Sequence, residues 1–348
     1  MRILLAADPI LPVPPTGYGG IERIVDALIR ELRTRGHAVG LIAKRGSTCT
    51  CEFMSAWPGE SVAGKADTLR NALALSRAVR DFDPDVIHSF ARLAYLTAVL
   101  PSRRPKIMSY QRHTSPAQVR PALRLARRGT LTFTACSEYI CIQGRSPSVA
   151  WHAIHNFADI TRIDFAPQVP ADAPLLFLSR VESIKGPDLA IAIARRAGRR
   201  LWVAGNRPAS GPEAAFFRDQ VEPHLGRNGI EWIGEVDDRR KNELLGQCAA
   251  LLVPIQWDEP FGIVFAEALA AGTPVLSCAR GALPEIVQPG VTGLFLTNVD
   301  DGAAAVRRIP ELDRTVCRRD AEQRFSPGGC VERYLKLYAE CVANCTVR

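Results

Sequence analysis

The sequence lacks the long apolar run that a membrane-spanning helix needs. No segment reaches about 18 consecutive apolar residues. At the start, MRILLAADPILPVPP holds one short apolar run that Asp8 and four prolines follow at once. We therefore expect a buried first strand there, and no signal peptide.

The sequence also lacks metal-ligand and redox spacings. Its 10 cysteines form no C-x-x-C pair, and none has histidines at zinc-finger spacing. Most lie in apolar runs such as TFTACS and PVLSCA, where a reduced cysteine acts as a small apolar side chain. We therefore expect no metal site and a reducing, cytoplasmic location.

Acidic residues are fewer than basic ones, and the formal net charge is +8. Aromatic residues are not interleaved with the basic ones, so no nucleic-acid partner is expected. A solvated helix face is the simpler interpretation of the excess positive charge. An anionic substrate, or peripheral contact with the inner face of a membrane, is the alternative. The excess lies largely in Arg120, Arg124, Arg127, Arg128, Arg195, Arg196, Arg199 and Arg200.

What is present is an alternation of β-type runs and amphipathic stretches along 348 residues. Continuous apolar strands separated by helices predict parallel sheets covered on both faces. Strands are expected at 3–8, 37–44, 85–90, 106–111, 131–137, 175–180, 200–205, 230–236, 250–255 and 274–279. Helices are expected at 20–35, 66–80, 187–197, 212–225, 238–248, 262–271 and 329–344.

The pattern breaks once, at APQVPADAP (166–174), which has the composition of a linker. The sequence therefore predicts an α/β protein of two Rossmann-like domains, residues 1–165 and 172–328. We expect the C-terminal segment 329–348 to pack back on the first domain. Ligands of such folds bind beyond the carboxyl ends of the strands, so the cleft between the domains is the expected site.

The loop TGYGG (16–20) lies between the first strand and its helix. Glycines let the backbone approach a ligand, and the helix N-terminus behind them suits an anion. A nicotinamide-cofactor fingerprint fits badly, because G-x-G-G is not G-x-G-x-x-G and Lys44 stands where a ribose-binding acid is wanted. A purely structural turn remains the alternative.

Charged residues mark the expected ligand edge of the second domain. Arg180 ends a strand and Lys185 precedes a helix, a pair that suits a diphosphate unless both are ordinary surface charges. In WDEPFGIVFAEALAAGTPV (257–275), Glu259 lies on a turn and Glu267 about one and a half turns into a helix. A ribose diol would be a suitable partner for Glu267, which has apolar neighbours; an exposed Glu267 is the alternative.

These motifs resemble family 4 of the glycosyltransferases, a retaining family of the GT-B fold. Glu259 and Glu267 meet its E-x7-E motif, and PFGIVFAEALAAGTPVL is close to its usual text. The resemblance extends in order over DVIH (85–88), QRH (111–113), ACSEY (135–139), HNFAD (155–159), GALPEIV (281–287) and TGLF (292–295). The turn AGNRPASGP (204–212) and Ser179 depart from the family text, and they leave the base and the sugar of the donor open.

The resemblance implies a role for each matching residue. His113, Arg180, Lys185 and Glu259 would act at the reacting sugar and the leaving phosphate. Glu267 would bind the ribose. His88 and Asn156 are weaker candidates, since a structural role suits His88 equally well. The full donor-binding set would be Gly19, Gly20, Arg180, Lys185, Gly234, Glu235, Val236, Glu259, Pro260, Phe261, Gly262, Ile263 and Glu267.

The reaction implied is transfer of a hexose from a nucleoside-diphosphate sugar to an acceptor hydroxyl, with retention. UDP-glucose or a related UDP-hexose is the expected donor, and neither a metal nor another cofactor is expected. The acceptor is not readable; it would contact loops 46–65 and 112–130. The alternatives are a catalytically silent nucleotide-sugar binder and another GT-B enzyme such as an epimerase.

Overall fold

The computed structural model describes the chain except for residues 18, 61–63, 146–148 and 347–348. The described chain divides into two compact units. Unit 1 consists of Met1–Asn156 with Pro327–Arg348, and unit 2 of Phe157–Ser326. Tyr18 of the GYGG loop, part of loop 46–65 and the end of segment 329–348 therefore lie outside the described residues.

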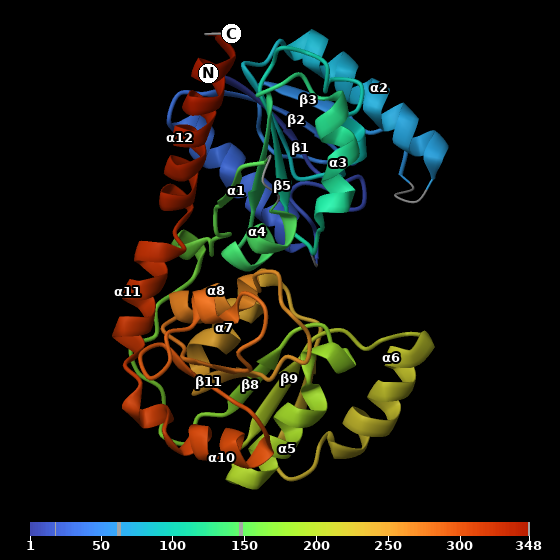
Figure 1. The fold of residues 1–348 in the computed structure, drawn as a ribbon. Helices are drawn as coiled ribbons and strands as arrows, with labels where there is room; N and C mark the ends of the chain where they lie inside the picture. Colours follow the sequence, from blue (N-terminus) through green and yellow to red (C-terminus); the bar gives the residue numbers. More distant parts are fainter. Residues whose placement is uncertain (18, 61–63, 146–148, 347–348) are drawn as a thin grey trace. The chain divides into compact units, whose positions relative to one another are not determined.

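The centre of unit 1 is a parallel sheet in the order β3-β2-β1-β4-β5-β6-β7 (Figure 1). Its apolar strands are buried; in β1, Ile3, Leu4 and Leu5 are fully inaccessible to solvent. The strands are β1 (Arg2–Ala6), β2 (Ala38–Ala43), β3 (Phe53–Ala56), β4 (Val86–Ser89), β5 (Lys106–Tyr110), β6 (Leu131–Ala135) and β7 (Trp151–Ala153).

The helices of unit 1 bury one apolar face each. In α1 that face holds Ile24, Leu28 and Leu32 at the helical period. The last helix, α12, packs against α1 (Figure 1). It also contacts β4. The helices are α1 (Gly20–Thr34), α2 (Lys65–Phe82), α3 (Pro116–Leu125), α4 (Glu138–Gly144) and α12 (Pro327–Thr346), with a 3-10 turn at Leu93–Leu96.

Unit 2 is built around a second parallel sheet, in the order β10-β9-β8-β11-β12-β13. Its strands are β8 (Leu175–Leu178), β9 (Leu201–Ala204), β10 (Ile230–Gly234), β11 (Ala250–Val253), β12 (Val275–Ser277) and β13 (Gly293–Phe295). Its helices are α5 (Pro187–Ala197), α6 (Gly211–Phe216), α7 (Asp238–Gln247), α8 (Ile263–Ala270), α9 (Leu283–Ile286), α10 (Val299–Arg307) and α11 (Arg314–Arg324). Short 3-10 turns occupy Ile160–Arg162, Ser183–Lys185, Glu222–His224 and Ile309–Glu311.

The two sheets confirm the predicted fold of two Rossmann-like domains with parallel strands. The expected strands are present with shorter bounds. The sequence patterns missed β3, β7 and β13, which have three or four residues each and are too short to show a period. The helix expected at 212–225 differs: α6 ends at Phe216, and a π turn (Phe217–Val221) and a 3-10 turn follow it.

The division between the units falls between Asn156 and Phe157, and the proline-rich segment 166–174 lies within unit 2. Unit 2 holds the preceding segment by its backbone. Arg314 Nε donates to the Ala166 carbonyl oxygen (2.7 Å), and Arg318 Nη1 donates to that of Ile163 (3.0 Å). The sequence around 166–174 does not show these bonds, because the donors are about 150 residues away in α11. The linker was predicted from the local composition alone.

Within the described residues, no helix has both the length and the apolar character needed to span a membrane.

Candidate active site

Each sheet reverses its strand order at one point, and in α/β sheets ligands bind at that point. In unit 2 the reversal lies between β8 and β11. The loop after β8 contacts the loop after β11 at Gly186, where an added Cβ would lie 2.3 Å from the Pro254 carbonyl oxygen. Gly186 also has a φ of 70°, so only glycine suits this approach. The two loops carry Lys185 and Glu259.

Lys185 and Glu259 form an ion pair at this switch point. Lys185 Nζ lies 2.5 Å from Glu259 Oε2, and the two residues are only 9% and 8% exposed. The indole N–H of Trp257 donates to the same carboxylate oxygen at 3.0 Å, and Lys185 Nζ lies 4.8 Å from the centre of the Trp257 ring. Two charges this far from water persist because each satisfies the other.

The backbone of Glu259 is fixed from a third strand. Gly281, in the loop after β12, has a φ of 58°, and a Cβ there would lie 2.3 Å from both the N and the O of Glu259. The Ala282 N–H donates to the Glu259 carbonyl oxygen at 2.8 Å. The predicted motif GALPEIV therefore acts on the turn: its first two residues hold Glu259 in place.

Helix α8 begins directly after that turn. Gly262 is its N-cap, with a φ of 85°, and a Cβ there would lie 2.5 Å from the Phe265 ring. A glycine cap has no side chain with which to accept from the first-turn N–H groups. The amides around Ile263 therefore face the same edge as Lys185, where they suit phosphate oxygens.

Glu267 lies within α8 and is held by a lysine that sequence reasoning missed. Lys241 Nζ, from α7, contacts Glu267 Oε1 and lies 3.1 Å from Asp238 Oδ1. Burial by itself would lower the pKa of Lys241, but the two carboxylates outweigh burial and raise it. Lys241 is therefore a cation. Lys241 lies four residues after Asp237, the N-cap of α7. Nothing in this local sequence indicated a contact with Glu267.

Arg180 differs from Lys185. Its guanidinium donates to Glu182 Oε1 (2.5 Å), and its side chain is 40% exposed. The two predicted phosphate ligands thus leave β8 by the same loop, but only Lys185 contacts a predicted glutamate. Glu213 fixes this loop by accepting from the Ser183 backbone N–H at 2.7 Å.

The segment 234–236, predicted to contact the base, follows β10. Gly234 has a φ of 81°, and its carbonyl oxygen accepts from the Gly205 N–H at 2.9 Å. Gly205 in turn allows a close approach to the loop of Arg180, since a Cβ there would lie 2.0 Å from the Ser179 carbonyl oxygen. Backbone contacts therefore join the ends of β8, β9 and β10 at one edge.

In unit 1, the glycine loop leads directly into α1. Gly20 is the first residue of the helix, and Gly19 has a φ of 153°. A Cβ at Gly19 would lie 2.7 Å from Pro15 Cβ and 3.1 Å from Glu22 Oε2. Burial raises the pKa of Glu22, while its own backbone N–H and nearby arginines counteract the rise.

His113 follows β5 and is exposed. Its Nδ1 lies 3.1 Å from Gln143 Oε1 of α4, and its ring lies edge-on to that of Tyr139. Next to it, Arg112 Nη2 lies 2.7 Å from Asp8 Oδ2. No sequence pattern had indicated Gln143 or Asp8 as neighbours of this strand end.

The weaker candidates His88 and Asn156 are both buried. His88 Nδ1 lies 2.6 Å from the Tyr338 hydroxyl and Nε2 lies 2.6 Å from Ser109 Oγ. Burial lowers its pKa to about 3, so its ring is neutral. Asn156 Nδ2 donates to Gln111 Oε1 at 2.8 Å. Because both ring nitrogens of His88 already have partners inside unit 1, we assign it no ligand contact.

Comparisons with known proteins agree with this geometry. Residues 160–322 match the family described as Glycosyl transferases group 1, and residues 18–162 match Glycosyltransferase Family 4. A glycosyltransferase involved in avilamycin A biosynthesis has a similar structure, with a TM-score of 0.74, 27% identity and 98% of each chain covered. The chain belongs to the glycosyltransferases of the GT-B fold.

Other similarities are partial or concern the fold alone. The glycosyltransferase is 34% identical to the glycogen synthase of Mycobacterium tuberculosis (strain ATCC 25618 / H37Rv) over 184 residues, which are 50% of this chain and 43% of that protein. The chain thus spans less than half the length of that relative. The Anabaena protein HepE, solved in complex with UDP-glucose, has the same fold at 18% identity, with a TM-score of 0.73 and 98% and 100% of the two chains covered.

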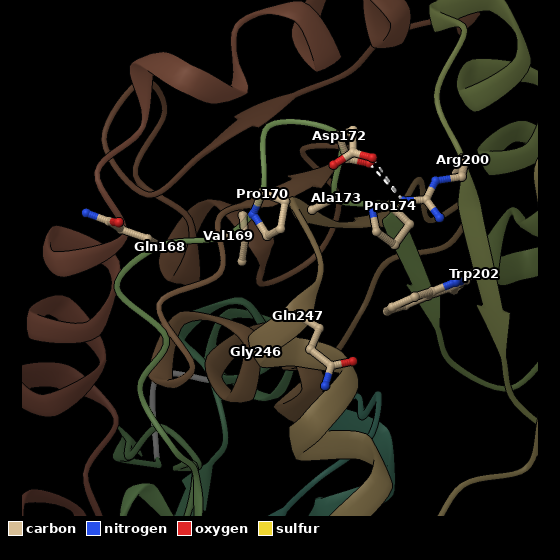
Figure 2. Close-up of a pocket in the computed structure, with 10 residues that line it drawn as sticks. All are labelled: Gln168, Val169, Pro170, Asp172, Ala173, Pro174, Arg200, Trp202, Gly246 and Gln247. Carbon is tan, nitrogen blue, oxygen red and sulfur yellow. Dashed lines mark hydrogen bonds and ion pairs between the residues drawn. The ribbon is translucent and has the colours of Figure 1, made fainter.

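A separate cavity of about 310 Å³ lies in unit 2 of the glycosyltransferase (Figure 2). It is lined by the segment before β8, by Arg200 and Trp202 at the start of β9, and by the end of α7. Parallel strands begin at one edge of a sheet and end at the other. The cavity is therefore at the opposite edge from Lys185 and Glu259, and we assign it no part in the site.

Proposed function

We propose that the glycosyltransferase transfers a hexosyl group from a nucleoside-diphosphate sugar to an acceptor hydroxyl, with retention of configuration and without a metal. A UDP-hexose such as UDP-glucose is the proposed donor, as in the complex of HepE. The observation that carries the proposal is the nearly buried pair Lys185–Glu259 at the switch point of the unit 2 sheet. A cation, a carboxylate and a helix N-terminus converge there, where a sugar diphosphate needs all three.

In this proposal the donor extends along the ligand edge of unit 2. Arg180, Lys185 and the amides of Phe261, Gly262 and Ile263 bind the diphosphate. Glu259 with Pro260 binds the hexose, Glu267 the ribose, and Gly234, Glu235 and Val236 the base. Gly19, Gly20 and His113 of unit 1 complete the set, with His113 at the reacting sugar. The known family pattern and the contacts described above support these roles.

The bond that breaks joins the anomeric carbon of the hexose to the terminal phosphate oxygen. Negative charge develops on that oxygen, and Lys185 with the N-terminus of α8 stabilises it. The acceptor oxygen bonds to the anomeric carbon on the face that the phosphate leaves, and its proton passes to the departing phosphate. The products are the new glycoside and the nucleoside diphosphate.

For the acceptor, we propose an anionic molecule, either free or at a membrane surface, contacting α3 in the segment 112–130. The side chains of Arg120, Arg124, Arg127 and Arg128 are exposed, and so is Leu125 of the same segment, at 53%. Cations around an apolar residue suit an anionic interface. If the acceptor is membrane-borne, we expect the protein to sediment with anionic vesicles but not with neutral ones. If the protein stays in the supernatant with both kinds of vesicle, the acceptor is a free anion.

The test is a panel of UDP-, GDP- and ADP-hexoses, assayed for thermal stabilisation and for release of nucleoside diphosphate, with and without a chelator. We expect stabilisation by one nucleotide class and slow hydrolysis that the chelator does not change. Stabilisation without release for any sugar, even with a set of acceptors, would instead indicate a silent binder. Conversion of the sugar without release would indicate an epimerase.

A further inference from the structure

A lysine outside the predicted donor set holds one of the two glutamates of the E-x7-E motif. Lys241 lies on α7, and its Nζ contacts Glu267 Oε1 on the neighbouring helix α8. The two side chains are only 16% and 12% exposed. Asp238, one turn before Lys241 on α7, is 3.1 Å from the same ammonium and is 52% exposed. The three residues form a chain from solvent to the half-buried carboxylate of Glu267.

This arrangement uses only one oxygen of Glu267. Within the described parts of the chain, Lys241 contacts Oε1, and no hydrogen bond to Oε2 occurs. Lys241 places a cation directly beside this carboxylate. A carboxylate oxygen binds hydroxyl donors more strongly than a neutral acceptor does, and Oε2 remains for such a donor.

We propose that Lys241 is a positioning residue for recognition of the ribose. It binds Oε1 of Glu267 and so orients the carboxylate, so that Oε2 accepts from the ribose diol of the donor. This inference rests on the proposed function, because it assigns the ribose to Glu267. It predicts that Lys241 contributes to the preference for ribose over deoxyribose, without contacting the nucleotide.

The experiment compares Lys241→Gln and Lys241→Arg with the unchanged protein. The control is Arg239→Gln, two residues away on the same helix, where the side chain is 88% exposed. Dissociation constants are measured for UDP, GDP and ADP, and then for the 2′,3′-dideoxy form of the tightest of them. The ratio of the two constants reports the contribution of the diol, and a general loss of structure would leave this ratio unchanged.

We expect Lys241→Gln to weaken binding of the ribonucleotide about tenfold, since a hydrogen bond to a charged group contributes roughly that factor. Binding of the dideoxy nucleotide should change little, so that the ratio falls toward one. Lys241→Arg should restore most of the ratio, and Arg239→Gln should leave it unchanged. If Lys241→Gln does not fold, Asp238→Asn replaces it, and a partial fall of the ratio is expected because only the anchor of Lys241 is lost.

The outcomes separate this inference from the proposed function. An unchanged ratio in the Lys241 variants, with a reduced ratio in Glu267→Gln, would overturn the role of Lys241 alone. If the unchanged protein already binds both nucleotides equally, the assignment of the ribose to Glu267 is wrong. If it binds none of the three ribonucleotides, the proposed function itself is overturned.

Discussion

The ligand edges of the two units differ in the charge and the burial of their side chains. In unit 2, the predicted glutamates are nearly buried, and each has its own lysine: Lys185 for Glu259 and Lys241 for Glu267. In unit 1, the corresponding edge has glycines and the exposed His113, and its ion pair between Arg112 and Asp8 includes an arginine that is 61% exposed. His88, one of the buried polar groups of unit 1, instead contacts Tyr338 of α12.

From this difference we infer that the two units have different roles in the proposed reaction. Charges that are fixed before the ligand arrives stabilise a developing charge without reorganisation, and unit 2 has such charges. Exposed side chains on loops adapt more readily to different partners, as on unit 1. Breaking an ion pair in unit 2 should therefore reduce turnover more than truncating a side chain at the edge of unit 1.

The largest effect is expected from Lys185→Ala. The change removes the cation proposed to stabilise the leaving phosphate and leaves Glu259 without its partner. Turnover of the donor should fall on the order of a thousandfold, the size of effect seen when a preorganised electrostatic contact is removed. Steady-state kinetics with the active sugar nucleotide measures it.

Lys336→Ala on α12 is the matched control, because that lysine is exposed and lies in unit 1. It should have the turnover of the unchanged protein. Turnover of Lys185→Ala within a factor of about three of the control would break the contrast between the units.

A smaller effect is expected from His113→Ala in unit 1. If His113 binds the reacting sugar, kcat should fall about tenfold, as for the loss of one hydrogen bond made in the transition state. Affinity for the nucleoside diphosphate should stay the same, since that ligand is proposed to bind unit 2. Isothermal titration with the nucleotide and kinetics with its sugar separate the two quantities. A parallel loss of nucleotide affinity would contradict the division of roles.

The smallest effect concerns stability and sharpens the reading of His88. Burial lowers its pKa from 6.5 to about 3, so the unfolded chain binds one more proton than the folded one between these values. The stability that the neutral ring contributes is present above pH about 6.5 and is lost as the pH falls below it. From pH 7 to pH 5 the loss should be about 2 kcal/mol.

Other groups titrate in the same range, so the measurement is a difference. Urea unfolding of the unchanged protein and of His88→Gln at both pH values isolates the histidine, because glutamine can still bond to Tyr338 and Ser109 but carries no titrating proton. The two proteins should differ less at the lower pH. A constant difference in unfolding free energy would show that folded His88 binds its proton as readily as the unfolded chain does, and its exclusion from the ligand edge would then fail.

The sequence by itself determined the class of fold and the main elements of the site. Continuous apolar runs and the 3.6-residue helical period are local properties, so they predicted every strand except β3, β7 and β13. Among the helices they predicted α1, α2, α5, α7, α8 and α12. The spacing of Glu259 and Glu267, with Gly262 between them, was readable for the same reason: a turn and the start of a helix need particular residues at fixed positions.

Only the tertiary structure decided which charged side chains form ion pairs. Lys241 is 26 residues from Glu267 along the chain, and Lys185 is 74 from Glu259, so no local pattern links them. It also decided that His88, within β4, is buried while His113, just after β5, is exposed, although the sequence placed both at the ends of similar apolar strands. Their environments come from other elements, α12 for His88 and α4 for His113, and only packing brings these elements to the two strand ends.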